Sequence, residues 1–491
     1  MQNLSRLLNP KSIAVIGGGA WCDSIISAAL QIGFNGILRP IHPSGKVIAG
    51  ITSLPKIEEF PGPIDAAFIG VNRHATLDIV AQLRSLNAGG ATCFASGFSE
   101  VAAEDAVGSD LQEKLILAAG DMPILGPNCY GFLNAFDGCS IWPDQHGCRK
   151  VESGVAILTQ SSNIAINLTM QTRGLPIGYV VTCGNQAQTS QTDVGLHLLD
   201  DSRVTAIGLH IEGFGDLRGW EDLANKALAK NVPLIALKTG RSRHARAAAV
   251  SHTASLAGSD AGAEALLARL GIRRASSLPV FLEALKLAHQ FGQLASNRLA
   301  SISCSGGEAA LAADSAHFTS LVFPPLNSRQ HAELSAALGP MVALANPLDY
   351  HTYIWRDEQA MTKAWAAMAD PDIALTLLIS DYPRADICDP NDWDCVTNAA
   401  ISAAQITQRP YAVVASLGEL MPEHIAKMLM ENGVAAINGL DHGIQALDLL
   451  TRALPQDPVP VLLPGNDRSA ELMDEHAAKQ DLAQHGLQVP R

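Results

Sequence analysis

A chain of 491 residues is long enough for about three domains of ordinary size, and its 47% hydrophobic and 17% charged residues exclude an intrinsically disordered protein. A formal net charge of −14 argues against a general affinity for nucleic acid, because nothing offsets repulsion from phosphates. The nine cysteines are scattered without a CxxC pair, and neither a signal peptide nor an apolar membrane span is apparent, so we expect a cytoplasmic protein with no disulfide framework, metal site or membrane contact.

The first part of the chain alternates between short apolar strands and helices. "KSIAVIGGG", residues 11–19, predicts a strand that runs into glycines, and "SIISAALQIG" after it predicts a helix. The alternation continues to "MPILGPNCYGFLNAF" and is typical of βαβ units in a parallel sheet. It predicts a Rossmann-like α/β domain over residues 1–136, and residues 137–153 read as a crossover linker.

Two further units repeat this architecture without repeating the sequence. "GVAILTQSSNIA" opens the second unit, which we place at residues 151–296, and "RLASISCSGGEAA" opens the third, at 297–465. Each begins with an apolar strand, small or hydroxyl residues, and then a helix, so both are predicted to be flavodoxin-like parallel-sheet domains. The polar stretch 466–491 predicts a peripheral tail with a helix.

The strand-to-helix junctions are candidate phosphate sites, because a helix start offers free backbone N–H groups and the positive end of its dipole. The first junction lacks the full GxGxxG fingerprint, so a plain tight turn explains it equally well, and Lys46 nearby is either a phosphate contact or a surface lysine. At the other two junctions, N-capping by Ser and Asn competes with phosphate binding. The residues at the three junctions are Gly17, Gly18 and Gly19; Gln160, Ser161, Ser162 and Asn163; and Ser305, Gly306 and Gly307.

A histidine in "VSHTASLAG", His252, is the candidate nucleophile. A nucleophilic histidine needs an acid that orients its second ring nitrogen and donors that hold the phosphoryl oxygens. Glu212, at the end of the apolar strand "LHIEG", is the candidate acid, although a capping role fits it as well. The sequence therefore holds every part of a phosphohistidine site.

Several motifs, in order along residues 5–460, resemble those of the NDP-forming acyl-CoA synthetases, the superfamily of succinyl-CoA ligase and ADP-forming acetyl-CoA synthetase. "VSHTASLAGSDA" resembles the family's phosphohistidine loop SHTG-x-LAGSD, and "GPNCYGFLN" resembles GPNCLG-x-x-N. "LKTGRS", "TQSSNIA", "SCSGGEAAL" and "ANPLDY" are similar to its LKAGRS, SQSGALA, T-x-GG and NPVD.

The resemblance implies an enzyme that makes an acyl-CoA thioester from a carboxylic acid, CoA and ATP, through an acyl-phosphate and a phosphohistidine at His252 supported by Glu212. The two later helix starts would hold the phosphate. The first domain would bind CoA through residues at the ends of its strands: Gly17, Gly18, Gly19, Lys46, Val71, Asn72, Ser96 and Asn128.

Three departures from the family pattern bear on this interpretation. Ser162 and Ala254 stand where the family has glycines, and no segment resembles the ATP-grasp module that loads the histidine. We therefore expect an α-type subunit in a hetero-oligomer, with ATP and Mg²⁺ on a separate ATP-grasp β-type subunit. The acid and the choice between ATP and GTP stay open.

Two other classes of function were weighed. A CoA- or acyl-CoA-binding scaffold or sensor is favoured by Ser162 and Ala254, and opposed by the retention of His252 and Glu212 together. A dinucleotide-dependent oxidoreductase fits poorly, because the glycine fingerprint is broken and no acidic residue clearly follows at the expected distance.

Overall fold

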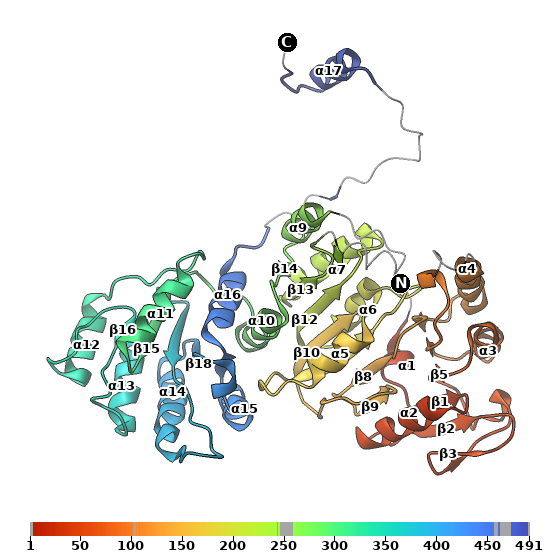
Figure 1. The fold of residues 1–491 in the computed structure, drawn as a ribbon, viewed down its shortest axis with the longest axis horizontal. Helices are drawn as coiled ribbons and strands as arrows, with labels where there is room; N and C mark the ends of the chain where they lie inside the picture. The colour runs from red at the N-terminus through yellow and green to blue at the C-terminus, as the bar shows by residue number, and fades with distance from the viewer. Residues whose placement is uncertain are drawn as a thin grey trace. The chain divides into compact units, whose positions relative to one another are not determined.

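The computed structural model describes residues 3–101, 105, 107–242, 244–245, 259–455, 460–461 and 473–489. The chain divides into two compact units, Met1–Pro458 and Val459–Arg491. The first unit contains three successive parallel sheets with helices around them, and the second contains the helix α17 (Glu475–Gln484) (Figure 1). Among the described residues, no helix is both long and apolar enough to cross a membrane.

The first sheet has the order β2-β1-β5-β6-β7 and all its neighbours are parallel. β1 is buried along its whole length, as expected for a central parallel strand covered on both faces. The order reverses between β1 and β5, which makes their carboxyl ends the place where doubly wound sheets bind ligands. Its elements are α1 (Ser5–Leu8), β1 (Ser12–Ile16), α2 (Ala20–Gln31), β2 (Ile37–Ile41), the hairpin β3 (Val47–Ile48) and β4 (Ile51–Thr52), β5 (Ala66–Ile69), α3 (Arg73–Ser85), β6 (Ala91–Cys93), α4 (Val107–Ala119) and β7 (Ile124–Leu125).

The second sheet has the order β14-β13-β12-β10-β11-β8-β9, in which β10 to β14 are parallel and β8 and β9 are antiparallel. Its switch point lies between β10 and β12. Its elements are β8 (Phe132–Asn134), β9 (Cys139–Ile141), β10 (Gly154–Thr159), α5 (Ser162–Thr169), β11 (Ile177–Thr182), α6 (Gln191–Leu198), β12 (Val204–Ile211), α7 (Leu217–Ala229), β13 (Leu234–Lys238), α9 (Asp260–Arg269), β14 (Arg273–Arg274) and α10 (Leu278–Phe291).

The hairpin of β8 and β9 spans the position where the sequence predicts the end of the first domain. β8 pairs with β11 of the second sheet, with Phe132 opposite Val181 and Asn134 opposite Tyr179. The segment read as a linker after residue 136 thus contains a strand of the second sheet. The same hairpin also contacts the first domain, because the Asn134 side chain donates a hydrogen bond to the Leu8 carbonyl at 3.0 Å. Strands of three residues carry too few positions to show a pattern in sequence.

The third sheet has the order β16-β15-β17-β18-β19 and is parallel throughout. If the five parallel strands of each sheet are numbered along the chain, their order across the sheet is 2-1-3-4-5 in all three domains. The three domains therefore share one topology and are α/β folds of the doubly wound type. Its elements are β15 (Leu299–Ser303), α11 (Gly306–Ala316), α12 (Ser328–Leu338), β16 (Leu348–Asp349), α13 (Glu358–Met368), β17 (Leu375–Ile379), α14 (Asp394–Thr407), β18 (Tyr411–Ala415), α15 (Glu423–Glu431), β19 (Val434–Asn438) and α16 (Leu440–Thr451).

Helix α10 joins the second and third domains, because it packs against β12 on one side and against α16 and β19 on the other. Two of its buried side chains are charged: Glu283 and Lys286 form an ion pair at 2.7 Å with no exposed surface on either side chain. Arg173 of the second domain binds the other carboxylate oxygen of Glu283 at 2.5 Å, and Asn438 of the third accepts from Lys286 at 2.8 Å. A charged network therefore ties the two domains together inside the core.

Candidate active site

The first two sheets contribute their carboxyl ends to one shared cleft of about 700 Å³. From the first sheet it takes residues that follow β5, β6 and β7, and from the second sheet residues that follow β10, β11 and β12. The lining residues are Trp21, Gly70, Val71, Asn72, Arg73, Phe94, Ala95, Ser96, Asn128, Cys129, Tyr130, Gln160, Ser161, Ser162, Asn163, Gly184, Asn185 and Glu212.

Four of the predicted CoA residues line this cleft: Val71, Asn72, Ser96 and Asn128. Asn72 is the N-cap of α3, and its side chain accepts hydrogen bonds from the backbone N–H groups of His74 and Ala75 at 3.1 and 3.0 Å. The start of α3 therefore points its positive end at the cleft, where an anionic group is favoured.

The glycine junction and Lys46 lie together at the ends of β1 and β2, and do not line the cleft. Gly17 has a φ of +130°, and a Cβ at this position would lie 2.6 Å from the carbonyl oxygen of Gly70, which does line it. Only glycine allows that approach. The Lys46 ammonium donates a hydrogen bond to the carbonyl of Gly18. These residues thus form a second polar group next to the cleft.

Aromatic side chains that the sequence analysis did not select form one wall of the cleft. The ring centroids of Trp21 and Phe94 are 5.3 Å apart, and that of Tyr130 lies 5.9 Å from Phe94 and 6.2 Å from Trp21. Trp21 keeps 44% of its surface exposed. Such rings suit a flat ligand group, which they can stack upon. Trp21 directly follows the motif "GGGA", and Tyr130 lies within "GPNCYG". Their closeness in sequence to predicted site residues is the feature that could have indicated a role in the cleft.

The side-chain amide of Gln160 binds the loop that follows β12. Its side-chain oxygen accepts hydrogen bonds from the backbone N–H groups of Glu212 and Gly213, and its amide nitrogen donates to the Gly213 carbonyl at 2.9 Å. The amide of Gln160 thus anchors the loop that carries Glu212, and its predicted phosphate contact stays a prediction. The two switch-point strands, β10 and β12, are thereby joined at the floor of the cleft.

The start of α5 lies in the cleft, with Ser161, Ser162 and Asn163 among its lining residues, and their phosphate contact stays a prediction. Ser161 is the N-cap and accepts a hydrogen bond from the N–H of Ile164 at 3.4 Å. The Ser162 hydroxyl accepts one from the N–H of Tyr130 at 3.2 Å, which links the helix start to the first-domain side of the cleft. The hydroxyl that replaces the glycine of the family motif therefore makes a contact between the two walls.

Glu212 lines the cleft at the end of β12, and buried basic groups lie behind it. The Lys238 ammonium donates to the Glu212 carbonyl at 2.9 Å, and burial lowers its pKa. His210, two residues earlier on β12, is buried against Thr159, and burial lowers its pKa to about 4, so it is a neutral core residue. The predicted nucleophile His252, and Ala254 with it, lie outside the described residues.

The third candidate junction does not line this cleft. Ser305, Gly306 and Gly307 lie at the N-terminus of α11, at the carboxyl edge of the third sheet. Next to them, the thiol of Cys304 contacts the carboxylate of Glu308 at 3.7 Å, and burial, followed by the charge of Asp381, raises the pKa of Glu308.

Cys129 lines the cleft, and burial raises the pKa of its thiol to about 12. It is a neutral thiol at physiological pH and lacks the thiolate that a nucleophile needs. Among the described residues, no cluster of three or more His, Cys, Asp or Glu side chains has the arrangement of a metal site.

Comparison with known families matches both domains that build the cleft. Residues 11–135 match the model of a CoA binding domain, and residues 152–288 match that of a succinyl-CoA ligase like flavodoxin domain. A relative over the whole chain is the trans-feruloyl-CoA synthase FCS1 of an unknown prokaryotic organism, 26% identical over 100% of this chain and 71% of its own length. The alpha subunit of acetate–CoA ligase [ADP-forming] II of Pyrococcus furiosus is 29% identical over 77% of this chain and 83% of its own.

In both matched domains and in these relatives, the chain resembles the NDP-forming acyl-CoA synthetases. The solved structure of the dinucleotide forming acetyl-coenzyme A synthetase 1 of Ca. Korarchaeum cryptofilum, in complex with phosphate and ADP, matches this chain with a TM-score of 0.79. It is 25% identical, and the match covers 92% of this chain and 96% of that one. The α/β class and the flavodoxin-like sheets predicted from the sequence are thus confirmed.

Proposed function

We propose that this chain is the α-type subunit of an NDP-forming acid–CoA ligase, which forms an acyl-CoA from a carboxylic acid, CoA and ATP. One observation carries the proposal: a single cleft holds residues predicted to bind CoA (Val71, Asn72, Ser96 and Asn128) together with the helix start predicted to bind phosphate (Ser161 to Asn163) and Glu212. A thioester and a phosphate must meet for this chemistry. The edge of the first sheet would bind CoA, and the edge of the second sheet would bind the phosphate.

In the direction of acyl-CoA breakdown the two steps balance without any further reactant. A phosphate oxygen attacks the thioester carbonyl, the C–S bond breaks, and the thiolate leaves and takes up a proton as CoA. The His252 ring then attacks the phosphorus of the acyl-phosphate, and the carboxylate leaves. The start of α5 would stabilise the phosphoryl oxygens, and Glu212 would orient the imidazole. In the direction of synthesis, a β-type ATP-grasp subunit that holds ATP and Mg²⁺ would transfer the γ-phosphoryl group of ATP to His252 and release ADP.

The assignment as an α-type subunit is supported by the relative that is named an alpha subunit, of which this chain spans the larger share. The chain spans 83% of the Pyrococcus furiosus alpha subunit and 71% of the feruloyl-CoA synthase. Two carboxylate classes, a short aliphatic acid and an aromatic acid, follow from those two names. The aromatic wall of Trp21, Phe94 and Tyr130 is compatible with both, since it can stack on adenine or on an aryl acid.

The test uses the chain without a partner. We incubate it with labelled inorganic phosphate and a panel of acyl-CoAs that includes acetyl-, phenylacetyl- and feruloyl-CoA. We expect acid-labile, base-stable label on the protein, absent from His252→Ala and strongly reduced in Glu212→Gln. The acyl-CoA that gives label identifies the acid.

The second candidate, a CoA- or acyl-CoA-binding scaffold or sensor, is favoured by the use of Ser162 as a structural bridge to Tyr130. Calorimetric titration with CoA separates the two functions. CoA binding without label from any acyl-CoA would replace the ligase by the scaffold, whereas the absence of both binding and label would contradict each of them.

A further inference from the structure

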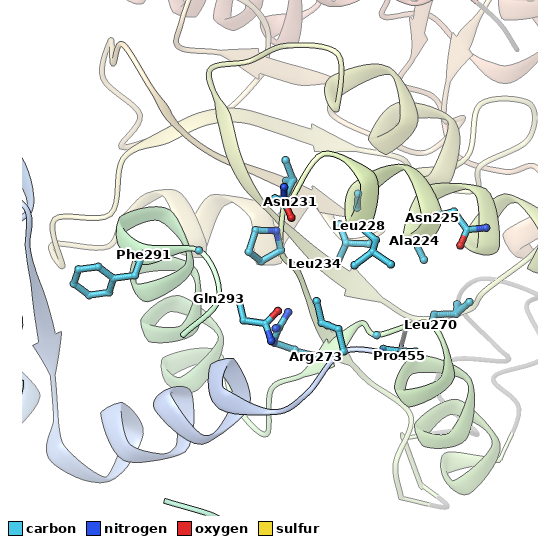
Figure 2. Close-up of a pocket in the computed structure, with 16 residues that line it drawn as sticks. Ala224, Asn225, Leu228, Asn231, Leu234, Leu270, Arg273, Phe291, Gln293 and Pro455 are labelled. Atoms are coloured by element: carbon cyan, nitrogen blue, oxygen red, sulfur yellow. The ribbon is translucent and has the colours of Figure 1, made fainter. Parts of the chain in front are cut away.

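A second pocket lies at the opposite end of the second sheet from the cleft. It has a volume of about 430 Å³, which falls in the range of small-molecule sites. Its residues come from the end of α7, the turn before β13, the turn between α9 and β14, the end of α10, and the segment after α16. They are Ala224, Asn225, Ala227, Leu228, Asn231, Val232, Pro233, Leu234, Leu270, Gly271, Arg273, Phe291, Gly292, Gln293, Leu454 and Pro455, and Figure 2 shows them as sticks.

Arg273 is the charged residue of this pocket and is buried, with 7% of its surface exposed. Its Nε donates a hydrogen bond to the Leu449 carbonyl at 2.9 Å, whereas its Nη2 is buried and has no hydrogen-bond partner in the described structure. Within the part of the chain that the structure describes, no carboxylate lies within ion-pair distance of it, and no acidic residue lines the pocket. Burial lowers its pKa to about 10, so the guanidinium is still charged at neutral pH.

The adjacent arginine shows how different this situation is. Arg274 binds two carboxylates of α9, donating to Asp260 and, at 2.9 Å, to Glu264. Two consecutive arginines in β14 thus differ in their counter-charges: one has two, and the other faces a pocket without any. A buried charge normally requires a partner, so the pocket around Arg273 is complete only with an anion in it.

The walls of the pocket specify what kind of anion fits. Leu228, Leu234, Leu270 and Pro455 supply apolar surface, which a small hydrated ion such as phosphate does not use. The amide of Gln293 lies beside Arg273 in Figure 2, and Asn231 adds a second amide to the pocket lining. An arginine fork suits a carboxylate, to which it can donate two parallel hydrogen bonds.

We propose that this pocket binds a small monocarboxylate with an apolar body, whose carboxylate pairs with Arg273. The site is separate from the cleft, because it lies at the amino ends of β13 and β14 whereas the cleft lies at the carboxyl ends of β10 to β12. Bound there, the acid contacts Leu270 and Gly271, which directly follow α9.

The experiment locates the ligand directly. Crystals of the full chain are soaked with 4-bromobenzoate, and anomalous data at the bromine edge give its position. We expect a bromine peak inside this pocket with the carboxylate at Arg273. In calorimetric titrations, 4-bromobenzoate should bind at least about tenfold more weakly to Arg273→Gln than to the wild type, and 4-bromobenzamide should not bind the site.

Matched variants keep the test decisive. Arg269→Gln, an exposed arginine on α9 outside the pocket, should bind as the wild type does. If Arg273→Gln does not fold, Leu228→Trp, which fills the pocket from a position that is 39% exposed, should abolish the binding while Arg273 stays in place. A bromine peak only in the cleft, equal affinity of the amide, or displacement by inorganic phosphate at equal concentration would overturn the proposal.

Discussion

Gly17 and Gly19 belong to the same glycine run but differ in what a side chain would meet. At Gly17 a Cβ would lie 2.6 Å from a backbone oxygen and φ is +130°, whereas at Gly19 nothing lies within 4 Å. We predict that Gly17→Ala destabilises the chain by about 2 kcal/mol or more, because it combines a backbone clash with a strained conformation. Gly19→Ala should change the unfolding free energy by less than about 1 kcal/mol. Chemical denaturation of both variants measures the difference, and equal effects would contradict it.

Gln160 directly follows β10, and its side chain binds the loop that carries Glu212, which lies far from it in sequence. We predict that Gln160→Leu lowers the unfolding free energy by about 1–3 kcal/mol, because two backbone N–H groups lose their acceptor. Phosphoenzyme formation should fall more steeply than stability, since Glu212 loses its anchor. The matched variant Gln160→Glu keeps the accepting oxygen and should retain more of the stability. If Gln160→Leu leaves phosphoenzyme formation unchanged, the anchoring role is wrong.

The contacts of Gln160 show which features of the site can be predicted from the sequence and which cannot. The sequence places Ser161, Ser162 and Asn163 at a helix start, and the structure puts that start in the cleft. It does not reveal that the amide of Gln160 is occupied by Gly213, because such a contact depends on how two strands align. The aromatic wall cannot be predicted from the sequence for the same reason, since its members come from three separate segments.

At the scale of elements, helix α10 depends on charges in its core. Glu283 pairs with both Arg173 and Lys286 and has no exposed surface. We predict that Glu283→Gln lowers the unfolding free energy by about 3–5 kcal/mol, because two cations then lack a counter-charge in a buried site. The double variant Glu283→Leu with Lys286→Met should lose less than Glu283→Gln, since it removes charge of both signs. Urea denaturation of both variants provides the measurement. A loss under about 1 kcal/mol in Glu283→Gln would exclude this role.

Element prediction succeeded where the pattern is long and failed where it is short. Buried strands of five or more residues, such as β1, β10 and β15, alternate with helices clearly enough to indicate three parallel sheets. The three-residue strands β8 and β9 do not, and their pairing with β11 is set by tertiary contacts. Strand order is likewise decided by packing of the whole sheet.

At the scale of the whole molecule, burial favours the neutral form of one buried histidine, His210, and of three partly buried ones, His146, His197 and His289. Burial lowers the pKa of His210 and His289 to about 4 and also lowers those of His146 and His197, all from an ordinary value of 6.5. Because the unfolded chain takes up these protons first, the stabilising contribution is complete above pH 6.5 and is lost as the pH falls towards 4.

We therefore predict that the unfolding free energy falls between pH 7 and pH 5, before the carboxylates titrate. The loss should be on the order of 3 kcal/mol for each of the two strongly shifted histidines by the time their folded pKa is reached. Denaturant titrations at three pH values measure it, and His210→Asn should show a shallower slope than the wild type. A flat profile between pH 7 and pH 5 would refute the prediction.

The hairpin of β8 and β9 has a practical consequence for anyone who recombines these domains. The CoA binding match ends at residue 135, which lies between β8 and β9. A graft joined there would deliver a foreign β8 to the host's β11 and separate it from its own partner strand. Hybrids with a new acyl specificity should instead be spliced between β7 and β8, so that the hairpin travels with the sheet it completes.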